Sequence, residues 1–262
     1  MDDRNHEQKL AEAIEILTNA RSAVALTGAG LSTASGIPDF RSPESGLWGK
    51  YNPFEVASIQ AFRRRPQDFY AWIRPLIDTT EQAEPNPAHL ALADLEKYGP
   101  LSGVITQNID ALHTKAGSRI IHEVHGHTRE VICIDCGISE DAAPKMAILV
   151  NEGSIPTCAH CGGVFKPKVI LFGELLPIDV MRAAELAAES CDVMIIAGSS
   201  LEVAPVNEFP RLAKRKGAKI IIVNFQETYA DYFADITFKS DVTQVLPALA
   251  APFVQAALNR SG

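Results

Sequence analysis

The chain has 262 residues, 47% of them hydrophobic and 21% charged, so it is long enough to bury one sizeable core. It carries 24 lysine and arginine residues against 32 aspartate and glutamate residues, a formal net charge of −8, with no long basic run, which argues against a nucleic-acid-binding protein. Its first residues are acidic and polar, and no apolar run reaches ~18 residues, so we expect no signal peptide and no membrane span and predict a cytoplasmic protein.

Apolar segments of helix length and of strand length alternate along the sequence. The first helical pattern covers residues 8–20, where Leu10, Ile14 and Leu17 share one face, and a short apolar strand follows at 23–26. Further runs of strand length occur at 103–106, 120–124, 169–172, 193–197, 219–223 and 236–238. Further helical patterns cover 86–99, 180–189, 207–216 and 242–258. Strands that alternate with helices predict an α/β fold, with a parallel sheet covered by helices on both faces.

Two segments interrupt this alternation. Residues 42–85 are rich in aromatic residues, arginine and proline and predict several helices, whereas residues 129–168 carry four of the five cysteines. We expect the two segments to pack together as a small inserted domain, comprising residues 43–85 and 126–167. The large domain then comprises residues 1–42, 86–125 and 168–262.

A glycine turn follows the first predicted strand. Gly28 and Gly30 form a Gly-x-Gly sequence, where missing side chains would let backbone N–H groups approach a pyrophosphate. The pattern predicts a dinucleotide site, although Thr33 stands in place of the third glycine and no acidic residue ends a second strand about 20 residues on. A glycine turn without a ligand therefore remains an alternative. The polar and aromatic loop at 36–41 has the composition of a segment that folds over a bound cofactor.

A second polar cluster follows the predicted strand at 103–106. It contains Gln107, Asn108 and Asp110, which would emerge at the carboxyl edge of the sheet, where folds of this class bind ligands. An Asn-x-Asp sequence after a strand is also typical of a helix cap, and that alternative stays open.

Three histidines lie close together near the next strand end. A histidine, with an ordinary pKa near ~6.5, suits a general base at neutral pH. Because alternate residues of a strand point to opposite faces, His122 and His125 could not share a metal ion without a bend. We predict His125, which a glycine follows, as a general base, and we assign His122 and His127 to surface or core positions.

Four cysteines form two Cys-x-x-Cys pairs. The pairs are Cys133 with Cys136 and Cys158 with Cys161, with 21 residues between them. Two such pairs offer four thiolates at tetrahedral geometry and leave no position for water, so the spacing predicts one structural Zn²⁺. His160 lies inside the second pair and is surplus to this set, and the isolated Cys191 is interpreted as a core residue.

Two further strand ends carry small polar residues. Gly198, Ser199 and Ser200 follow the strand at 193–197, and Asn224 follows the strand at 219–223. Hydroxyl groups suit phosphate oxygens, and an asparagine can meet a ribose hydroxyl. Each sequence is as typical of a plain turn, so the prediction rests on their convergence at one edge with the other clusters.

With these residues identified, residues 21–247 resemble a bacterial-type sirtuin, the family of NAD-dependent protein-lysine deacylases. The matching motifs, in the order of the family, are Gly-Ala-Gly-Leu-Ser at 28–32, Gly-Ile-Pro-Asp-Phe-Arg at 36–41, Thr-Gln-Asn-Ile-Asp at 106–110, Leu-His at 112–113, His-Gly at 125–126, the paired cysteines, Phe-Gly-Glu at 172–174, Gly-Ser-Ser-Leu at 198–201 and Val-Asn at 223–224.

The resemblance implies a Rossmann-like, doubly wound NAD-binding domain and a small domain made of a zinc ribbon-like module and a helical module. It implies Asn108, Asp110 and His125 as catalytic residues. The expected NAD-binding residues are Gly28, Ala29, Gly30, Ser32, Ile37, Asp39, Phe40, Arg41, Gln107, Asn108, Ile109, Asp110, His125, Gly198, Ser199, Ser200, Asn224, Phe225 and Val242. The expected substrate-contacting residues are Phe40, His125, Ile170, Phe172, Gly173, Glu174 and Val203.

In the implied reaction, the acyl oxygen of an acyl-lysine protein attacks the ribose carbon that carries nicotinamide. His125 then removes a proton from a ribose hydroxyl, which attacks the acyl carbon, and water completes the release of lysine and O-acyl-ADP-ribose. An apolar tunnel would select acylated lysine, because a charged lysine loses its hydration on entering. Neither a specific nucleic acid nor a membrane is expected as a partner.

The sequence also bears on which acyl group is accepted. Family members that remove succinyl or malonyl groups carry a Tyr-x-x-Arg pair, whose arginine would receive the acyl carboxylate. Here Ile73 stands three positions after Tyr70, with Arg74 one place further, and the placement of Pro66 aligns the pair of the family with Ile73 and Leu76. Both are apolar, so we predict acetyl and other uncharged acyl groups.

Two alternatives remain. An NAD glycohydrolase or ADP-ribosyltransferase would use the same site, with water or a protein nucleophile capturing the ribose carbon, but that route has no need of His125 for a second step. A non-catalytic NAD-binding module is disfavoured because Asn108, Asp110 and His125 are all present.

Overall fold

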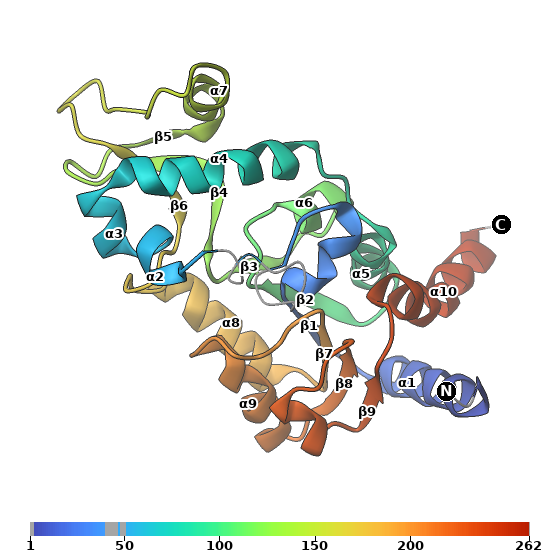
Figure 1. The fold of residues 1–262 in the computed structure, drawn as a ribbon. Coiled ribbons are helices and arrows are strands. Elements are labelled where there is room, and N and C mark those ends of the chain that lie inside the picture. Colours follow the sequence, from blue (N-terminus) through green and yellow to red (C-terminus); the bar gives the residue numbers. More distant parts are fainter. Residues whose placement is uncertain (1–2, 40–46, 48–50, 262) are drawn as a thin grey trace.

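A computed structural model describes residues 3–39, 47 and 51–261 and has a parallel sheet at the centre of its larger part (Figure 1). Within these residues the sheet has six strands in the order β3-β2-β1-β7-β8-β9. The strands are β1 (Ala23–Thr27), β2 (Leu101–Thr106), β3 (Ile121–Glu123), β7 (Val193–Ala197), β8 (Lys219–Val223) and β9 (Ile236–Phe238). The chain winds outward from β1 to β3, returns beside β1 and winds the other way to β9. This is the doubly wound topology that the sequence predicts. In such sheets a ligand crevice lies where the strand order reverses, which here is between β1 and β7.

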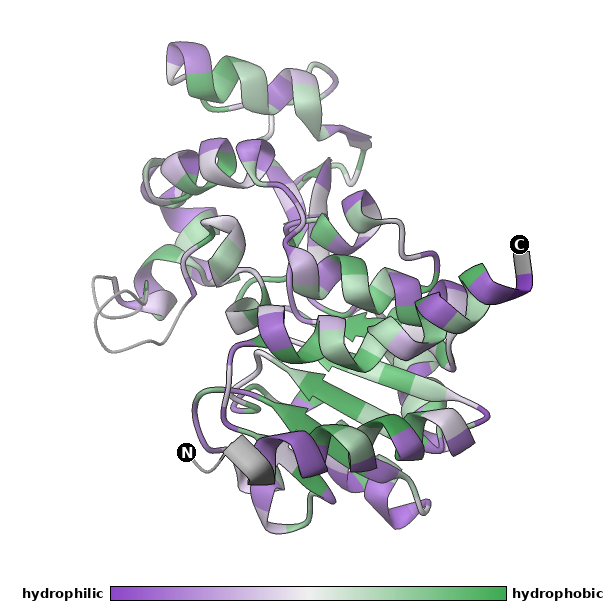
Figure 2. Cartoon of the chain, turned by 90° about the vertical axis from the view of Figure 1, so that its right-hand side faces the viewer, coloured by the Kyte–Doolittle hydropathy of each residue, from purple (hydrophilic) through white to green (hydrophobic). Residues whose placement is uncertain are grey.

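Helices cover both faces of this sheet. One face is covered by α1 (Asp3–Asn19), α5 (Pro87–Tyr98) and α10 (Val242–Ser261), and the other by α8 (Ile178–Ser190) and α9 (Phe209–Arg215). Successive strand residues serve the two faces, so that Ile195 packs under α10 while Ile196 packs toward α8 and α9. Figure 2 shows the result, with apolar strands between helices whose outer faces are hydrophilic.

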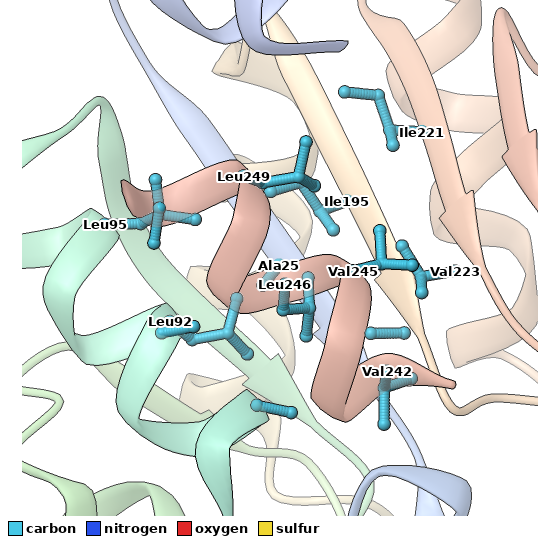
Figure 3. Close-up of a cluster of buried hydrophobic side chains, with 14 of the residues drawn as sticks. Ala25, Leu92, Leu95, Ile195, Ile221, Val223, Val242, Val245, Leu246 and Leu249 are labelled. Carbon is cyan, nitrogen blue, oxygen red and sulfur yellow. The ribbon is translucent and has the colours of Figure 1, made fainter. Parts of the chain in front are cut away.

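The face under α5 and α10 is shown in Figure 3. Leu92 of α5 and Leu246 of α10 are fully buried, and they meet strand residues such as Ile195 of β7. Burying one such aliphatic side chain contributes roughly 1.5–3 kcal/mol. This face therefore anchors the C-terminal helix, which continues past the expected end at residue 258.

The two inserted segments pack together around one core. The first segment forms α2 (Pro53–Val56), α3 (Ile59–Arg64) and α4 (Pro66–Gln82), and the second forms β4 (Gly126–Cys133), β5 (Ser139–Asp141), α7 (Ala142–Glu152) and β6 (Phe165–Val169). The three strands form an antiparallel sheet in the order β5-β4-β6. Phe69 and Tyr70 of α4 share one core with Val131 and Phe165 of the sheet, and the Tyr70 hydroxyl donates to the carbonyl oxygen of Phe165 at 2.5 Å. The helical and cysteine-bearing segments thus stabilise each other.

Short elements connect the two domains and the strand ends. They are the helix α6 (Leu112–Ala116) and 3₁₀ turns at Ala29–Leu31, Thr33–Ser35, Val206–Glu208 and Tyr229–Tyr232. In the described part of the chain, no helix combines the length and the apolar character needed to cross a membrane.

The prediction of a strand at 169–172 was wrong. β6 ends at Val169 and pairs with β4 of the small sheet, and the apolar residues that follow it belong to no strand. Leu171 is buried in the core of the small domain, and Phe172 packs against that core. This run is apolar because it forms the wall between the two domains, a role that a hydrophobic pattern alone does not distinguish from that of a buried strand.

Candidate functional site

A cavity of about 1060 Å³ lies along the carboxyl edge of the central sheet and against the small domain. Its wall takes residues from the end of every central strand. In the order of the sheet these are His125 after β3, Gln107 and Asn108 after β2, residues 28–30 after β1, residues 198–200 after β7, Asn224 after β8, and Asp241 and Val242 after β9. The polar clusters that the sequence placed at strand ends therefore meet at one edge.

The two glycine loops at the centre of this edge pack directly against each other. A Cβ atom added at Gly28 or Gly30 would lie 2.8 or 2.9 Å from the carbonyl oxygen of Gly198. Gly198 itself has a φ of +61°, and a Cβ there would lie 2.1 Å from the backbone nitrogen of Leu31. The glycines thus let the loops after β1 and β7 touch, which differs from the expected role of clearing space for a pyrophosphate. The resulting narrow floor still exposes both loops to the cavity.

A buried hydrogen-bond network holds Asn108 and Asp110 in place. The Asn108 amide donates to the carbonyl oxygen of Gly28 at 3.0 Å and to the Ser32 hydroxyl at 3.1 Å. Ser32 in turn donates to the Asp110 carboxylate at 2.6 Å, and the other oxygen of that carboxylate accepts from the backbone N–H of Leu112 at 2.9 Å. The N-cap residue of α6 is Ala111 rather than Asp110, although Asp110 does accept from the N–H of Leu112, the first residue of the helix. Asp110 also reaches the wall residue Asn108 through Ser32.

Two buried histidines lie under this network. The Nε2 atom of His89 lies 3.5 Å from the Ser32 hydroxyl, and that of His113 lies 3.0 Å from the Thr27 hydroxyl. Their rings are 5.1 Å apart. Burial and, to a smaller extent, the neighbouring His89 lower the pKa of His113 to about 3. Burial lowers the pKa of His89 to about 4 against the opposing charge of Asp110. Both rings are therefore neutral at physiological pH.

These two histidines make the folded state sensitive to acid. Because their pKa values are lower in the folded chain than in the unfolded chain, the unfolded state binds more protons as the pH falls below ~6.5. We expect the contribution of these two histidines to the free energy of unfolding to be fully present above that pH and to be lost as the pH falls toward 4. In that range each histidine should lower the free energy of unfolding by roughly 1.4 kcal/mol per pH unit. Urea unfolding at a series of pH values measures this slope. H113Q removes one of the two groups and should reduce the slope, so an equal slope in H113Q would contradict the assignment.

His125 stands at the junction of the two domains with a defined tautomer. Its Nδ1 atom lies 3.2 Å from the carbonyl oxygen of Gln107. A carbonyl oxygen can only accept, so Nδ1 carries the proton and the basic lone pair of the neutral ring lies on Nε2. The ring borders the cavity, whereas His122 and His127 are not among the described wall residues. Of the three clustered histidines, His125 is therefore the one placed to act on a ligand in the cavity.

The end of the cavity beyond His125 is apolar. Its wall comprises Ala57, Phe69, Trp72, Ile73, Ile109, Val169, Ile170, Leu171 and Phe172. Ile73 borders this end, but Arg74 does not, because its guanidinium donates to the carbonyl oxygen of Val150 on α7. Among the described wall residues, this end has no cationic side chain to meet an acyl carboxylate.

The sequence predictions for the cavity wall fall into three groups. The wall contains Gly28, Ala29, Gly30, Asp39, Gln107, Asn108, Ile109, His125, Ile170, Phe172, Gly173, Glu174, Gly198, Ser199, Ser200, Val203, Asn224, Phe225 and Val242. Ser32 and Asp110 lie behind the wall, in the network under Asn108, and Ile37 donates its backbone N–H to the carbonyl oxygen of Ser32 at 3.4 Å. Phe40 and Arg41 lie outside the described residues.

The four paired cysteines come together in the small domain, and their sulfur atoms lie within 4.8 Å of one another. The Sγ atoms of Cys133 and Cys161 are 3.5 Å apart, and those of Cys136 and Cys158 are 3.7 Å apart. Zn–S bonds of ~2.3 Å place the sulfurs of a tetrahedron ~3.8 Å apart. The geometry fits one zinc ion with four thiolates. The surplus His160 is exposed and outside the cluster, and Cys191 is buried in the core, as predicted.

Sequence reasoning missed the residues that support the site from behind. His89 is one example, and the Lys166 ammonium, which binds Glu174, is another. His113 is named only as part of the Leu-His motif at 112–113, with no role assigned to it. His89 lies on the apolar face of α5 with Ala88 and Leu92, so a polar residue on a helix face that is otherwise apolar was the available signal.

Comparisons with known proteins agree with this geometry. The family model described as Sir2 family matches residues 28–205. "NAD-dependent protein deacylase 2" of Archaeoglobus fulgidus is 46% identical over 244 residues, which cover 93% of this chain and 95% of that protein. "NAD-dependent protein deacetylase 1" of Geobacillus kaustophilus is 44% identical over 219 residues, covering 84% and 88%.

Solved structures extend the likeness to the fold. One that concerns the mechanism and regulation of Sir2 enzymes has a TM-score of 0.89 and 44% identity, covering 95% of this chain and 99% of the other. A Sir2–p53 peptide–NAD⁺ complex has a TM-score of 0.84 and 37% identity, covering 95% and 99%. Sir2Tm bound to a propionylated peptide has a TM-score of 0.83 and 36% identity, covering 95% and 98%.

Proposed function

The chain belongs to the Sir2 family, and on this basis we propose that it is an NAD-dependent protein-lysine deacetylase that transfers the acyl group to ADP-ribose. The observation that carries the proposal is the continuous cavity from Asn224, past His125, to the apolar end at Ile73. A dinucleotide fits along the strand ends, and an acylated lysine fits the apolar end. The two ligands would meet at His125, whose Nε2 atom carries the basic lone pair.

NAD is proposed to lie across the carboxyl edge, with its diphosphate over the loops after β1 and β7. Ala29, Ser199 and Ser200 border that part of the cavity, while Asn224 and Val242 border the adenosine end. Ser199 accepts a hydrogen bond from the Gln107 amide at 2.9 Å, which links this floor to the nicotinamide end. Gln107 and Asn108 are proposed to surround the nicotinamide ribose, with Asp110 acting from behind through Ser32. This placement accounts for the mixture of small and amide side chains along one edge.

His125 is proposed as the general base. In the reaction, the acyl oxygen displaces nicotinamide from the ribose carbon, and a ribose hydroxyl then captures the acyl carbon. Nε2 of His125 accepts the proton of that hydroxyl, while the Gln107 carbonyl holds Nδ1 and orients the ring. The ring is placed where the polar and apolar ends of the cavity meet, so it can reach a group shared between the two reactants.

The acyl-lysine is proposed to enter past Phe172 and Val203 into the apolar end. A charged lysine would lose its hydration there without a counter-charge, whereas an acylated lysine is neutral, so desolvation selects the modified side chain. The substrate backbone is proposed to run between Gly173 and Val203, which both border the cavity.

Zinc is proposed to bind the four cysteines as a structural ion, supplying no chemistry and stabilising the fold of the small domain. The proposed compartment is the cytoplasm, where such thiolates stay reduced.

The proposal is tested by incubating the protein with an acetyl-lysine peptide, with and without NAD, and following free peptide and nicotinamide together. We expect deacetylation only with NAD, and nicotinamide release only with the acetylated peptide. Nicotinamide release without deacetylation would indicate a glycohydrolase or ADP-ribosyltransferase at the same site. Absence of both products in a folded, zinc-loaded sample would contradict enzymatic activity of this class.

Acyl selectivity gives a separate prediction. Since the apolar end is bordered by Ile73 while Arg74 points to α7, a succinyl carboxylate would be buried there without a partner. We expect kcat/KM for a succinyl peptide to be at least ~100-fold lower than for the same peptide with an acetyl group, as for a buried unpaired charge. A propionyl peptide is the uncharged control and should be turned over. Faster turnover of the succinyl peptide would contradict the predicted selectivity.

A further inference from the structure

Lys166 of β6 is a buried lysine whose ammonium has defined partners. It is 4% exposed. Its Nζ atom donates to the carbonyl oxygen of Val169 at 2.7 Å and to the Glu174 carboxylate at 2.9 Å. Burial lowers the pKa of Lys166, and the charge of Glu174 opposes that shift. A lysine is rarely buried unless it is paired, so this one needs a structural reason.

The Glu174 carboxylate binds both the Lys166 ammonium and the backbone of the chain. The carboxylate oxygen that accepts from Lys166 also accepts from the backbone N–H of Leu171 at 2.8 Å. One ammonium and one carboxylate thereby connect the beginning, the middle and the end of residues 169–174. Glu174 borders the cavity, yet its carboxylate is used inside the chain.

This six-residue segment, which we name the wall loop, connects His125 to the helical module. Its residue Ile170 donates its N–H to the carbonyl oxygen of His125 at 2.8 Å. Phe172 donates to the carbonyl oxygen of Ala57 at 2.9 Å, and its own carbonyl oxygen accepts from the N–H of Ile59 at 3.0 Å. All six residues of the wall loop border the cavity. A shift of the loop would therefore move the apolar end and His125 together.

We propose that Lys166 and Glu174 are a positioning pair for the acyl-lysine substrate, which fixes the shape of the wall loop and thereby the acyl-lysine channel. The inference rests on the proposed function, because it assigns this wall to the acyl-lysine. Neither side chain takes part in the chemistry. Their role is to hold the backbone carbonyl of Val169 and the backbone N–H of Leu171 in fixed directions.

The chemistry of the pair explains why charged groups serve this role. An apolar residue at position 166 could fill the same volume, and such replacements of buried ion pairs often keep or raise stability. It could not, however, hold the Val169 carbonyl oxygen and the Glu174 carboxylate at once, because that needs two donors on one atom. The pair therefore contributes to the geometry of the loop more than to the stability of the fold.

The test is K166M, which keeps the length of the side chain and removes the donors. Lys168 offers a matched control on the same strand, because it is partly exposed and pairs with Glu130 at 3.1 Å, away from the wall loop. In K166M we expect KM for an acetyl-lysine peptide to rise ~10-fold to 100-fold, as for an active-site misplacement of about 1 Å, with KM for NAD and zinc content within twofold of the wild type. K168M should match the wild type, and K166R, which keeps the charge and the donors, should recover at least half of the lost kcat/KM.

Several outcomes would overturn the inference. One is a peptide KM in K166M equal to that of the wild type, and another is an equal rise in KM for NAD and for the peptide, which indicates a general structural role. If K166M does not fold, E174M replaces it, because methionine keeps the length of the side chain and removes the oxygen that accepts from both Lys166 and the Leu171 N–H. An unchanged peptide KM in E174M contradicts the pair. The wild-type reaction separates the two claims, because a wild type that does not deacetylate contradicts the proposed function itself.

Discussion

Replacing His125 with alanine is expected to slow deacetylation by ~10² to 10⁴-fold, the usual contribution of a positioned general base. In the proposed reaction the ring accepts a ribose proton, and its Nδ1 is held by the Gln107 carbonyl oxygen at 3.2 Å. The proposed dinucleotide contacts along the strand ends come mainly from residues other than His125, so NAD binding should remain within a fewfold of the wild type. Product formation under saturating NAD and peptide, together with an NAD titration, measures both effects.

His122→Ala is the matched control for that variant. His122 lies on β3, close in sequence to His125, but it is not among the described residues of the cavity wall. The His122→Ala variant should therefore deacetylate at the wild-type rate. If H125A deacetylates at the wild-type rate, or if H122A loses activity to the same extent, the assignment of the base is wrong.

Replacing Cys133 with alanine is expected to unfold the small domain. The cysteine belongs to the four-sulfur cluster, and structural zinc supplies ~10–16 kcal/mol in small zinc-binding peptides, which is comparable to the ~5–15 kcal/mol that stabilises a typical domain. Cys133 also lies in the same core as Phe69, Tyr70 and Phe165. Unfolding that begins at the zinc-free cysteine cluster should therefore extend to the helical module. Zinc content, thermal unfolding and soluble yield measure the effect.

Cys191→Ala is the control for the zinc site. Cys191 is buried between the sheet and α8, away from the cluster, so this variant should bind one zinc ion and lose only the packing of one sulfur atom. A Cys133→Ala protein that is folded, metal-free and active would contradict the structural role of zinc.

Much of the fold could be predicted because the sequence pattern and the packing agree. The strands at 193–197, 219–223 and 236–238 begin and end as predicted. The apolar runs of β7 and β8 are buried on both faces of a parallel sheet, and the edge strand β9 buries Ile236 and Phe238 on one face. The convergence of Gly28, Asn108 and Asn224 on one cavity followed from the same topology, because parallel strands end at one edge.

The remainder could not be predicted because it depends on contacts between distant segments. The apolar run at 169–172 is a wall between domains, and only the pairing of β6 with β4 reveals that it is not a central strand. Similarly, Lys166 resembles an ordinary exposed lysine in the sequence until Val169 and Glu174 are brought around its ammonium. Gly28 and Gly30 do border the cavity, but the sequence does not show that they are also needed where the chain touches Gly198.

The two domains contribute different parts of the proposed selectivity. The strand ends of the large domain present small, amide and hydroxyl groups to a dinucleotide, while Phe69, Trp72 and Ile73 of the small domain present an apolar surface to the acyl group. His125 lies between them and is hydrogen-bonded through its backbone to Ile170 of the wall loop. A change in the small domain should therefore alter peptide binding before it alters NAD binding.

The central claim is that NAD cleavage and deacylation are one reaction at one site. It is tested most directly by a product balance: the wild-type protein is incubated with NAD and an acetyl-lysine peptide, and nicotinamide, free peptide and O-acetyl-ADP-ribose are quantified in the same samples over time. We predict that the three products accumulate in equal amounts and that H125A forms almost no free peptide and no O-acetyl-ADP-ribose, with at most about one nicotinamide per enzyme molecule, because His125 acts after nicotinamide has left. Nicotinamide and free ADP-ribose forming in excess of deacetylated peptide, or acetate forming without O-acetyl-ADP-ribose, would contradict it.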